Sequence, residues 1–319
     1  MKKNNIKGSL ILCLTALIWG LAFVAQSDGG ELVPPLTFNA LRSFIAAAAL
    51  YIFYKVTSFK KEKRFFPEDK ALKKQYVTAG IICGALLAVS VNFQQFGISA
   101  YPKGAAAEAR SGFITALYVV FVPLLSLFFG KKAGPVIWAS VAVAVAGFYM
   151  LCFSGGIGGI YLADILVAVC ALCFASQIIA VDKFVGLTGG VKLSVMQFAV
   201  TGIISTLLAV IFERPSFNNI IAAAPQIIYL GVVSSGVGYT LQIVGQKYAE
   251  PSVASLSMSL ESVFAALGGW LISGNTLSGR ELIGCATVFA AIIVAQIPEM
   301  IGNKKAEKQN AAFPPQQTD

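Results

Sequence analysis

Ten long apolar stretches occupy most of this 319-residue chain, five on each side of a Gly-rich segment at 154–159. Each stretch approaches the roughly 20 residues that a helix needs to cross a bilayer. Because lipid cannot hydrogen-bond an exposed backbone, helices are the expected form. The predicted membrane-spanning segments are 8–27, 35–54, 77–99, 104–129, 135–153, 160–181, 191–212, 222–246, 251–273 and 278–297. The sequence therefore predicts an all-α integral membrane protein with ten transmembrane helices.

Composition excludes an ordinary soluble domain. Hydrophobic residues make up 57% of the chain and charged residues only 12%, and the mean hydropathy is +0.76. The formal net charge of +9 could indicate a nucleic-acid partner, but most of the charged residues fall in the short loops between apolar stretches. We therefore expect no nucleic-acid partner.

The positive charges are divided unequally between the two sets of loops. If the N-terminus is cytoplasmic, 19 of the 24 Lys and Arg residues lie in cytoplasmic segments and three lie outside. The outer three are Lys103, Arg214 and Arg280. Since cytoplasmic loops carry the excess of positive charge, both termini are predicted to be cytoplasmic.

Five spans in each half require the two halves to sit in opposite orientations. The predicted units are residues 1–154 and 155–300, followed by a disordered cytoplasmic tail at 301–319. Inverted repeats are the usual plan of secondary transporters, with the substrate site near the midplane. The two halves therefore predict two inverted five-helix repeats.

Residues suited to catalysis or metal binding are scarce. The chain has no His, and its six Cys all lie within predicted spans, where Cys usually packs as a small apolar residue. The loops are too short to hold a soluble catalytic domain, and no phosphate-binding loop motif is present. We expect no enzyme activity, no catalytic residues, no cofactor and no metal.

Several motifs resemble the two EamA repeats of the drug/metabolite transporter superfamily. In the first half they are Trp19-Gly20 with Phe23, NFQQFG at 92–97 and ARSGFITALYVVFVP at 109–123. In the second half they are ADIL at 163–166, ASLSMSLE at 254–261 and FAALGGW at 264–270. The resemblance covers residues 8–297. It implies a ten-helix bundle of two inverted repeats in a bacterial inner membrane that exports a small metabolite, such as an amino acid or a drug-like solute.

Glu261 is the sharpest candidate for a substrate or coupling site. It lies about ten residues into its predicted span, roughly 15 Å deep and close to the midplane. A charged side chain there costs about 2.5–3.5 kcal/mol, so it should face a cavity or a partner. The alternatives are a site for a substrate amine or a proton, and a neutral glutamic acid bonded to a neighbouring helix.

Three charged residues are placed near the predicted outer mouth. Glu108 and Arg110 begin the fourth span, and Arg42 lies about seven residues into the second from the same side. Glu108 and Arg110 do not share a helical face, so an Arg42–Glu108 pair is as plausible as a local one. We expect a structural ion pair or outer gate; the alternative is an arginine that binds a substrate carboxylate.

Polar side chains within other spans complete the candidate site. Shared helical faces and central placement select Asn92, Gln95, Tyr118, Gln177, Tyr239 and Gln242 as substrate-binding or coupling candidates. Bonding of these amides across helices is the alternative. Small residues at Gly80, Gly84, Gly231 and Ser235 predict that the third and eighth spans pack closely on each other. Pro123 is the predicted kink of the fourth span.

These features predict a secondary transporter that works by alternating access, exporting a small metabolite across the membrane. A lipid or lipid-headgroup flippase and an uncoupled facilitator are the alternatives. The expected partners are a small-molecule substrate, membrane lipids and, in a coupled version, protons. Monomer and homodimer remain equally open.

Overall fold

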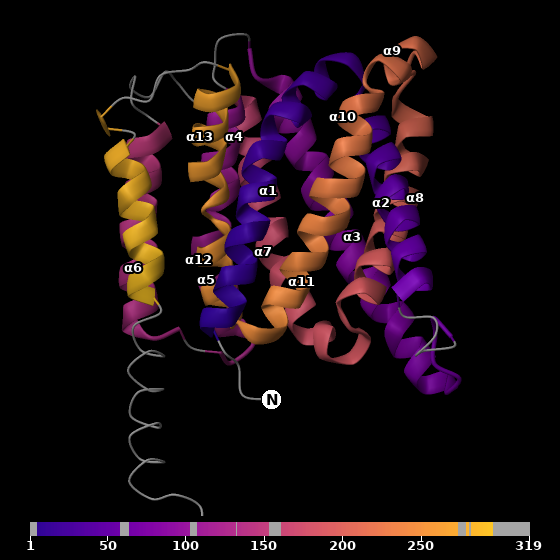
Figure 1. The fold of residues 1–319 in the computed structure, drawn as a ribbon, viewed down its shortest axis with the longest axis horizontal. Coiled ribbons are helices and arrows are strands. Elements are labelled where there is room, and N and C mark those ends of the chain that lie inside the picture. Colours follow the sequence, from indigo (N-terminus) through magenta and orange to yellow (C-terminus); the bar gives the residue numbers. More distant parts are fainter. Residues whose placement is uncertain are drawn as a thin grey trace, which may run out of the picture.

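The computed structural model describes residues 5–57, 64–102, 107–131, 133–152, 161–273, 279–280 and 282–295. Every regular element in these ranges is a helix. The helices are α1 (Asn5–Leu32), α2 (Pro35–Thr57), α3 (Lys70–Ala100), α4 (Ala107–Ala116), α5 (Tyr118–Phe128), α6 (Pro135–Cys152), α7 (Leu162–Thr188), α8 (Gly190–Phe212), α9 (Phe217–Ala222), α10 (Ala224–Tyr229), the π-helix η1 (Leu230–Gly238), α11 (Tyr239–Tyr248), α12 (Pro251–Met258) and α13 (Glu261–Ser273), followed by a helix at Leu282–Ala295. They form one bundle of upright helices (Figure 1). The Gly-rich segment at 154–159 and the tail at 301–319 lie outside the described residues.

Seven helical segments of the described chain are long and apolar enough to cross a membrane. They correspond to the first to fourth and sixth to eighth predicted spans. The fifth and tenth contain shorter apolar helices, at Pro135–Gly147 and Leu282–Ala295, and the ninth is divided into α12 and α13. The prediction of a multi-pass helical membrane protein is confirmed, while the count of ten spanning helices stays a prediction.

The described helix ends that carry lysines, namely the end of α2, the start of α3 and the ends of α7 and α11, lie at the end of the bundle where the marked N-terminus also lies (Figure 1), which we call the lysine-rich end. Lys7 lies 4.4 Å from the ring of Tyr248, and Lys192 lies 5.4 Å from the ring of Tyr54. This grouping agrees with the loop alternation predicted from charge. That this end is cytoplasmic remains a prediction.

The carboxylate of Glu213, directly after α8, bonds to the start of α2 at the opposite end of the bundle. Its Oε1 accepts a hydrogen bond from the backbone N of Leu36 at 2.8 Å, and its Oε2 accepts one from the N of Thr37 at 2.7 Å. These amides belong to the first turn of α2, which has no helical partners for them. The carboxylate also complements the positive end of the helix dipole.

Close packing at glycines does not follow the predicted pairing of helices. A Cβ added at Gly84 of α3 would lie 2.6 Å from the Cβ of Val200 in α8, and one at Gly231 of η1 would lie 2.7 Å from Ile45 in α2. These small residues therefore bring α3 against α8 and η1 against α2. The predicted close packing of the third and eighth spans through them is wrong, because each small face is turned toward another neighbour.

Two predicted spans are interrupted near their middles. The fourth is distorted at Leu117, whose N bonds the O of Ile114 at 3.2 Å in a tightened turn, within the apolar helix Arg110–Phe128. Pro123 is buried inside α5, and its kink stays a prediction. The ninth breaks after Ser259, and Ser262 N bonds the O of Ser259 at 3.3 Å in a similar turn.

The two interrupted segments pack against each other. α4 contacts α13, and α5 contacts α12. Across the first pair, the hydroxyl of Ser262 donates to the O of Gly112 at 2.7 Å. Both interruptions therefore lie deep in the bundle, where half-helices begin at Tyr118 and Glu261.

Candidate functional site

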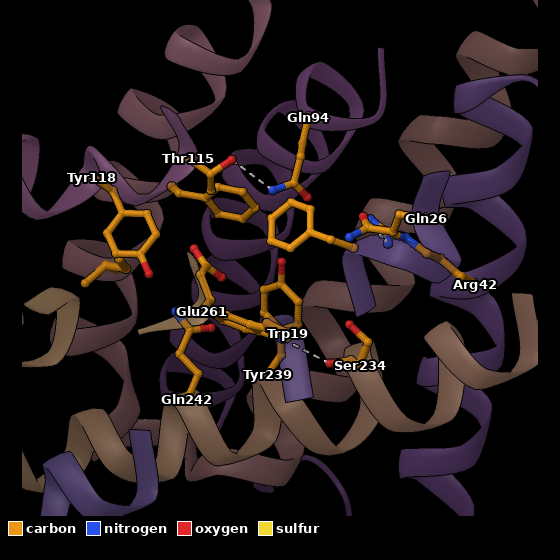
Figure 2. Close-up of a pocket in the computed structure, with 13 residues that line it drawn as sticks. Trp19, Gln26, Arg42, Gln94, Thr115, Tyr118, Ser234, Tyr239, Gln242 and Glu261 are labelled. Atoms are coloured by element: carbon orange, nitrogen blue, oxygen red, sulfur yellow. Dashed lines mark hydrogen bonds between the residues drawn. The ribbon is translucent and has the colours of Figure 1, made fainter. Parts of the chain in front are cut away.

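A small cavity lies between η1 and the interrupted parts of α4–α5 and α12–α13. Its lining combines aromatic side chains with polar groups from α1, α2, α3, α4, α5, α7, η1, α11 and α13. The lining residues are Trp19, Phe23, Gln26, Arg42, Gln94, Thr115, Tyr118, Phe174, Ile178, Ser234, Tyr239, Gln242 and Glu261. Figure 2 shows their polar ends converging on the shared space. Interrupted transmembrane helices and π-helical segments are frequent at functional sites.

The cavity has a volume of about 30 Å³. That is enough for one or two water molecules, but far below the roughly 300–1,000 Å³ of typical ligand pockets. The structure therefore represents a closed arrangement of the helices around this space.

Glu261 and Tyr118 approach the cavity from the starts of two half-helices. Glu261 is the first residue of α13 and Tyr118 the first of α5, and they are 3% and 2% exposed. Their polar ends point toward one another in Figure 2. The Tyr118 hydroxyl faces the Glu261 carboxylate, and apart from each other the Glu261 Oε1 and the Tyr118 hydroxyl have no hydrogen-bond partner in the described part of the chain. Such groups are costly to bury unless something else bonds to them.

Arg42 reaches the cavity from the side opposite Glu261 (Figure 2). Its side chain is 4% exposed, and its Nη1 donates to the Gln26 Oε1 at 2.9 Å. Its guanidinium also lies 6.0 Å from the ring of Phe38. Among the described residues, no ion pair joins Arg42 to a carboxylate. The predicted pairing of Arg42 with Glu108 is therefore not found.

Aromatic rings lie between the two charged groups. The rings of Trp19 and Tyr239 have centroids 4.6 Å apart, and Phe198 packs edge-on to Tyr239 at 5.2 Å. The indole Nε1 of Trp19 donates to the O of Ser234 at 3.2 Å, which fixes the ring against η1. Along one wall, Gln94 Nε2 donates to the Thr115 hydroxyl at 3.2 Å.

Four of the seven substrate-site candidates line this cavity: Glu261, Tyr118, Tyr239 and Gln242. Gln242 Nε2 donates to the Gln177 Oε1 at 3.0 Å, and Gln177 in turn donates to Gln197 at 3.3 Å. Gln177 therefore lies behind the lining as part of an amide chain that links α11, α7 and α8. This bonding matches the cross-helix alternative for Gln177.

Asn92 and Gln95 point away from the cavity. Asn92 accepts from Asn39 at 2.8 Å and donates to the Ser205 hydroxyl at 2.9 Å, joining α2, α3 and α8. Gln95 Nε2 donates to the O of Gln26 at 3.0 Å. The residue that does line the cavity from α3 is Gln94, one position earlier.

Sequence reasoning also missed Gln26, Thr115 and Ser234 among the lining residues. Gln26 carried a detectable signal, because an amide within an apolar span is uncommon. Thr115 and Ser234 carried none, since small hydroxyl residues are common in membrane helices, where they bond back to the chain.

A second buried polar cluster lies near the predicted outer end. Asp164 Oδ2 accepts from Arg110 Nη2 at 2.7 Å, and its Oδ1 accepts from Arg110 Nε at 3.2 Å. The hydroxyl of Tyr101 donates to the same Oδ1 at 2.6 Å, and the backbone N of Tyr161 donates to Oδ2 at 2.8 Å. Arg110 therefore pairs with Asp164 of α7 rather than with Glu108, because residues two apart project from different helical faces.

The surroundings of this ion pair keep Tyr101 neutral. Burial, followed by its hydrogen bond to Asp164, raises the pKa of Tyr101 above its ordinary value. The ring of Tyr161 lies 4.8 Å from the guanidinium of Arg110 and covers it. The pair is thus enclosed by groups from the end of α3 and the start of α7.

No group of three or more His, Cys, Asp or Glu residues in the described ranges is placed to hold a metal ion. The groups that line the central cavity offer a ligand charge, hydrogen bonds and aromatic contact.

Known proteins with similar sequences are transporters. An uncharacterized transporter of Archaeoglobus fulgidus is 27% identical, over 92% of this chain and 87% of its own length. The uncharacterized inner membrane transporter YedA of Escherichia coli K12 is 23% identical over 88% of each chain. The uncharacterized transporter YoaV of Bacillus subtilis is 24% identical over 88% of this chain and 95% of its own.

A crystal structure with 19% sequence identity superposes with a TM-score of 0.72, covering 91% of this chain and 96% of that one. This likeness shows a shared fold. The EamA-like transporter family matches residues 6–153 and again residues 161–296. With both halves matched, the chain belongs to the EamA-like transporter family and is a multi-pass membrane protein of transporter type.

Proposed function

We propose that this protein is a secondary transporter that works by alternating access and exports a small zwitterionic metabolite, such as an amino acid. One observation carries the proposal. Glu261 and Arg42 line opposite sides of one cavity, and neither has an ion-pair partner among the described residues.

A zwitterion supplies the two missing partners at once. Burying an unpaired charge costs several kcal/mol, and an opposite charge with good hydrogen bonds repays that cost. A ligand amine at Glu261 and a ligand carboxylate at Arg42 would leave the rest of the ligand between them. The rings of Trp19 and Tyr239, 4.6 Å apart, offer apolar contact there.

The closed cavity supports transport by helix movement. A volume of about 30 Å³ does not admit a metabolite, so entry requires the surrounding helices to separate. Ion pairs hold both ends of α7 to its neighbours: Asp164 pairs with Arg110, and Asp182 pairs with Lys131. In our proposal each pair opens in turn while the other stays closed, as residues 1–154 and 155–300 move as inverted repeats.

Export is the direction implied by the resemblance to drug/metabolite transporters. In the coupled version, a proton exchanges with the substrate amine at Glu261. In the uncoupled version, the substrate moves down its own gradient. An imposed pH gradient across proteoliposomes distinguishes them, because only the coupled transporter accumulates substrate against its gradient.

Counterflow in proteoliposomes tests the substrate class. Labelled amino acids would be competed with their decarboxylated amines and their N-acetylated acids, which each lack one charge. We expect the zwitterions to compete at least about thirtyfold better than either analogue, since each buried charge contact is worth about 2 kcal/mol or more. Equal competition by the amines or the acids would overturn the zwitterion proposal.

Two variants assign the ends of the ligand. Arg42→Gln should remove the preference for the amino acid over its amine, and Glu261→Gln should remove the preference over the N-acetylated acid. Glu31→Gln is the matched control, because Glu31 lies on the exposed surface of α1. Movement of labelled phospholipid without counterflow of any solute would instead support a flippase.

A further inference from the structure

A second cavity opens on the side of the bundle between α3, α5 and α7. Its volume is about 520 Å³, and it shares no lining residue with the central cavity. The lining is mainly apolar and includes Ile82, Leu86, Leu125, Phe129, Ile179 and Phe184. We refer to this cavity as the lateral crevice.

The lateral crevice faces the surroundings of the bundle. Ile82 at its wall is 39% exposed and Phe129 is 67% exposed, so the mouth is lined by apolar side chains that point outward. In a membrane protein these surfaces contact lipid chains. An occupant that enters by this route must therefore be apolar over most of its length.

Charge is confined to one end of the crevice. Lys131, Asp182 and Lys183 line it there, at the lysine-rich end of the bundle. Lys131 pairs with Asp182, so the three groups together carry one net positive charge. Lys183 lies next to the mouth and is exposed.

We propose that the lateral crevice binds an anionic phospholipid from the leaflet at the lysine-rich end. One acyl chain fills the apolar part, and the phosphate is bound by Lys131 and Lys183. A phosphodiester carries one negative charge, which balances the net positive charge of the three side chains. Basic pockets between transmembrane helices are suited to such headgroups.

The position of the crevice gives the bound lipid a structural effect. The lateral crevice lies between α5 and α7, beside the Lys131–Asp182 ion pair. This pair joins α7 to the residues that directly follow α5 at this end of the bundle. A lipid bound across both helices stabilises this closed arrangement, because a ligand stabilises the state that it binds. Anionic lipid would thus raise the thermal stability of the purified protein.

The test compares phosphatidylglycerol with phosphatidylcholine of the same acyl chains, added to the full-length protein in detergent. Binding would be measured by native mass spectrometry and stability by thermal unfolding. We expect one tightly bound phosphatidylglycerol and a higher melting temperature than with phosphatidylcholine. Lys183→Gln should weaken phosphatidylglycerol binding about fivefold, the effect of about one basic residue near anionic lipid.

Lys247→Gln is the matched control. Lys247 is an exposed lysine in the last turn of α11 at the same end and does not line the crevice. This variant removes the same charge and should keep the binding of the unmodified protein. Equal weakening by both variants would show general attraction to anionic lipid and would overturn the proposal.

A second variant blocks the crevice without changing charge. Ala180→Phe places a ring in the apolar part and should abolish tight binding of phosphatidylglycerol; retained binding would contradict the proposal. If this variant does not fold, Ile82→Trp at the mouth provides the readout. Its added fluorescence should be quenched by phosphatidylglycerol with brominated chains more than by the phosphatidylcholine equivalent, and equal quenching would overturn the site.

Water-soluble glycerol phosphate separates the lipid from a free phosphate ligand. It carries the same phosphate chemistry without acyl chains. We expect no rise in melting temperature at concentrations where phosphatidylglycerol saturates the protein. An equal rise would show that the lysines bind phosphate alone, and the proposed lipid site would be wrong.

Discussion

The two buried charged regions of this bundle differ in how completely the chain satisfies them. Around Asp164, both carboxylate oxygens accept hydrogen bonds from Arg110, and Tyr101 and the backbone of Tyr161 add two more. Around the central cavity, Glu261 Oε1 and the hydroxyl of Tyr118 have no hydrogen-bond partner in the described chain apart from each other.

This difference separates a structural role from a binding role. Buried polar groups in folded proteins are nearly always bonded, so the exceptions require an explanation. The ion pair near the predicted outer end is complete without a ligand, while in our proposal the bound substrate supplies the missing partners in the central cavity. Charge in a membrane span is therefore a weaker sign of a binding site than charge that remains unsatisfied.

Glu261→Gln should give the largest effect. The amide cannot form an ion pair with a ligand amine, and loss of a buried charge contact costs about 2–5 kcal/mol. We expect counterflow in proteoliposomes to fall at least about thirtyfold. Folding should be intact, because a neutral amide is less costly to bury than an unpaired carboxylate.

A pH series sharpens this prediction. If Glu261 carries the coupling proton, exchange by the unmodified protein should depend on pH, and any residual exchange by Glu261→Gln should not. Glu31→Gln, with the same change of charge at the exposed surface of α1, should behave like the unmodified protein. Normal counterflow by Glu261→Gln would remove Glu261 from the site.

Asp164→Asn should show the opposite pattern. It leaves Arg110, only 9% exposed, without its charged partner, and breaking a buried pair costs about 3 kcal/mol or more. The free energy of unfolding should fall by about that amount, while the KM of the folded protein stays close to normal. The exposed Arg64–Glu68 pair, at 70% and 75% side-chain exposure, provides the control: Glu68→Gln should cost less than about 1 kcal/mol.

A double-mutant cycle tests whether Arg110 and Asp164 act as a pair. Arg110→Gln combined with Asp164→Asn should destabilise by less than the sum of the single changes, because the double variant leaves neither charge buried alone. Additive effects would show that the ion pair is not what holds α4 to α7.

The helical segments could be predicted because apolar length and loop charge do not depend on which face a helix presents. To predict the central site, the face that each helix turns toward the cavity must also be known. Gln94 and Gln95 are adjacent, yet a rotation of about 100° between them decides that Gln94 lines the cavity and Gln95 bonds the backbone of α1. Amphipathic periodicity cannot supply that rotation in a span that is apolar on every side.

The interruptions of α4–α5 and α12–α13 could not be predicted from the sequence either. Pro123 was the local signal in the fourth span, and the tightened turn at Leu117, six residues earlier, carried no such signal because Leu is not a helix-breaking residue. The partner of Arg110 was hidden for another reason. Asp164 is 54 residues away, and helix packing rather than local spacing brings the two together.

Substitution of one tyrosine in each of the two regions should give smaller effects on binding and stability. Tyr118→Phe removes a buried hydroxyl that has only the Glu261 carboxylate as a candidate partner in the described chain, so the free energy of unfolding should change by no more than about 1 kcal/mol. If this hydroxyl bonds the ligand, KM should rise about five- to tenfold, the equivalent of about 1–1.4 kcal/mol. An unchanged KM would place Tyr118 outside the binding surface.

Tyr101→Phe should affect stability and not binding, because the hydroxyl of Tyr101 already donates a hydrogen bond to Asp164 at 2.6 Å. We expect a loss of about 1 kcal/mol in the free energy of unfolding and no change in KM. Burial and Asp164 raise the pKa of Tyr101 above its ordinary value, so folding favours the neutral hydroxyl. The stability that this adds is complete below about pH 10, the ordinary pKa of tyrosine, and declines as the pH rises toward the folded value. Thermal unfolding between pH 8 and 11 should therefore show a smaller alkaline loss in Tyr101→Phe than in the unmodified protein, and parallel losses would mean that Tyr101 does not support the ion pair.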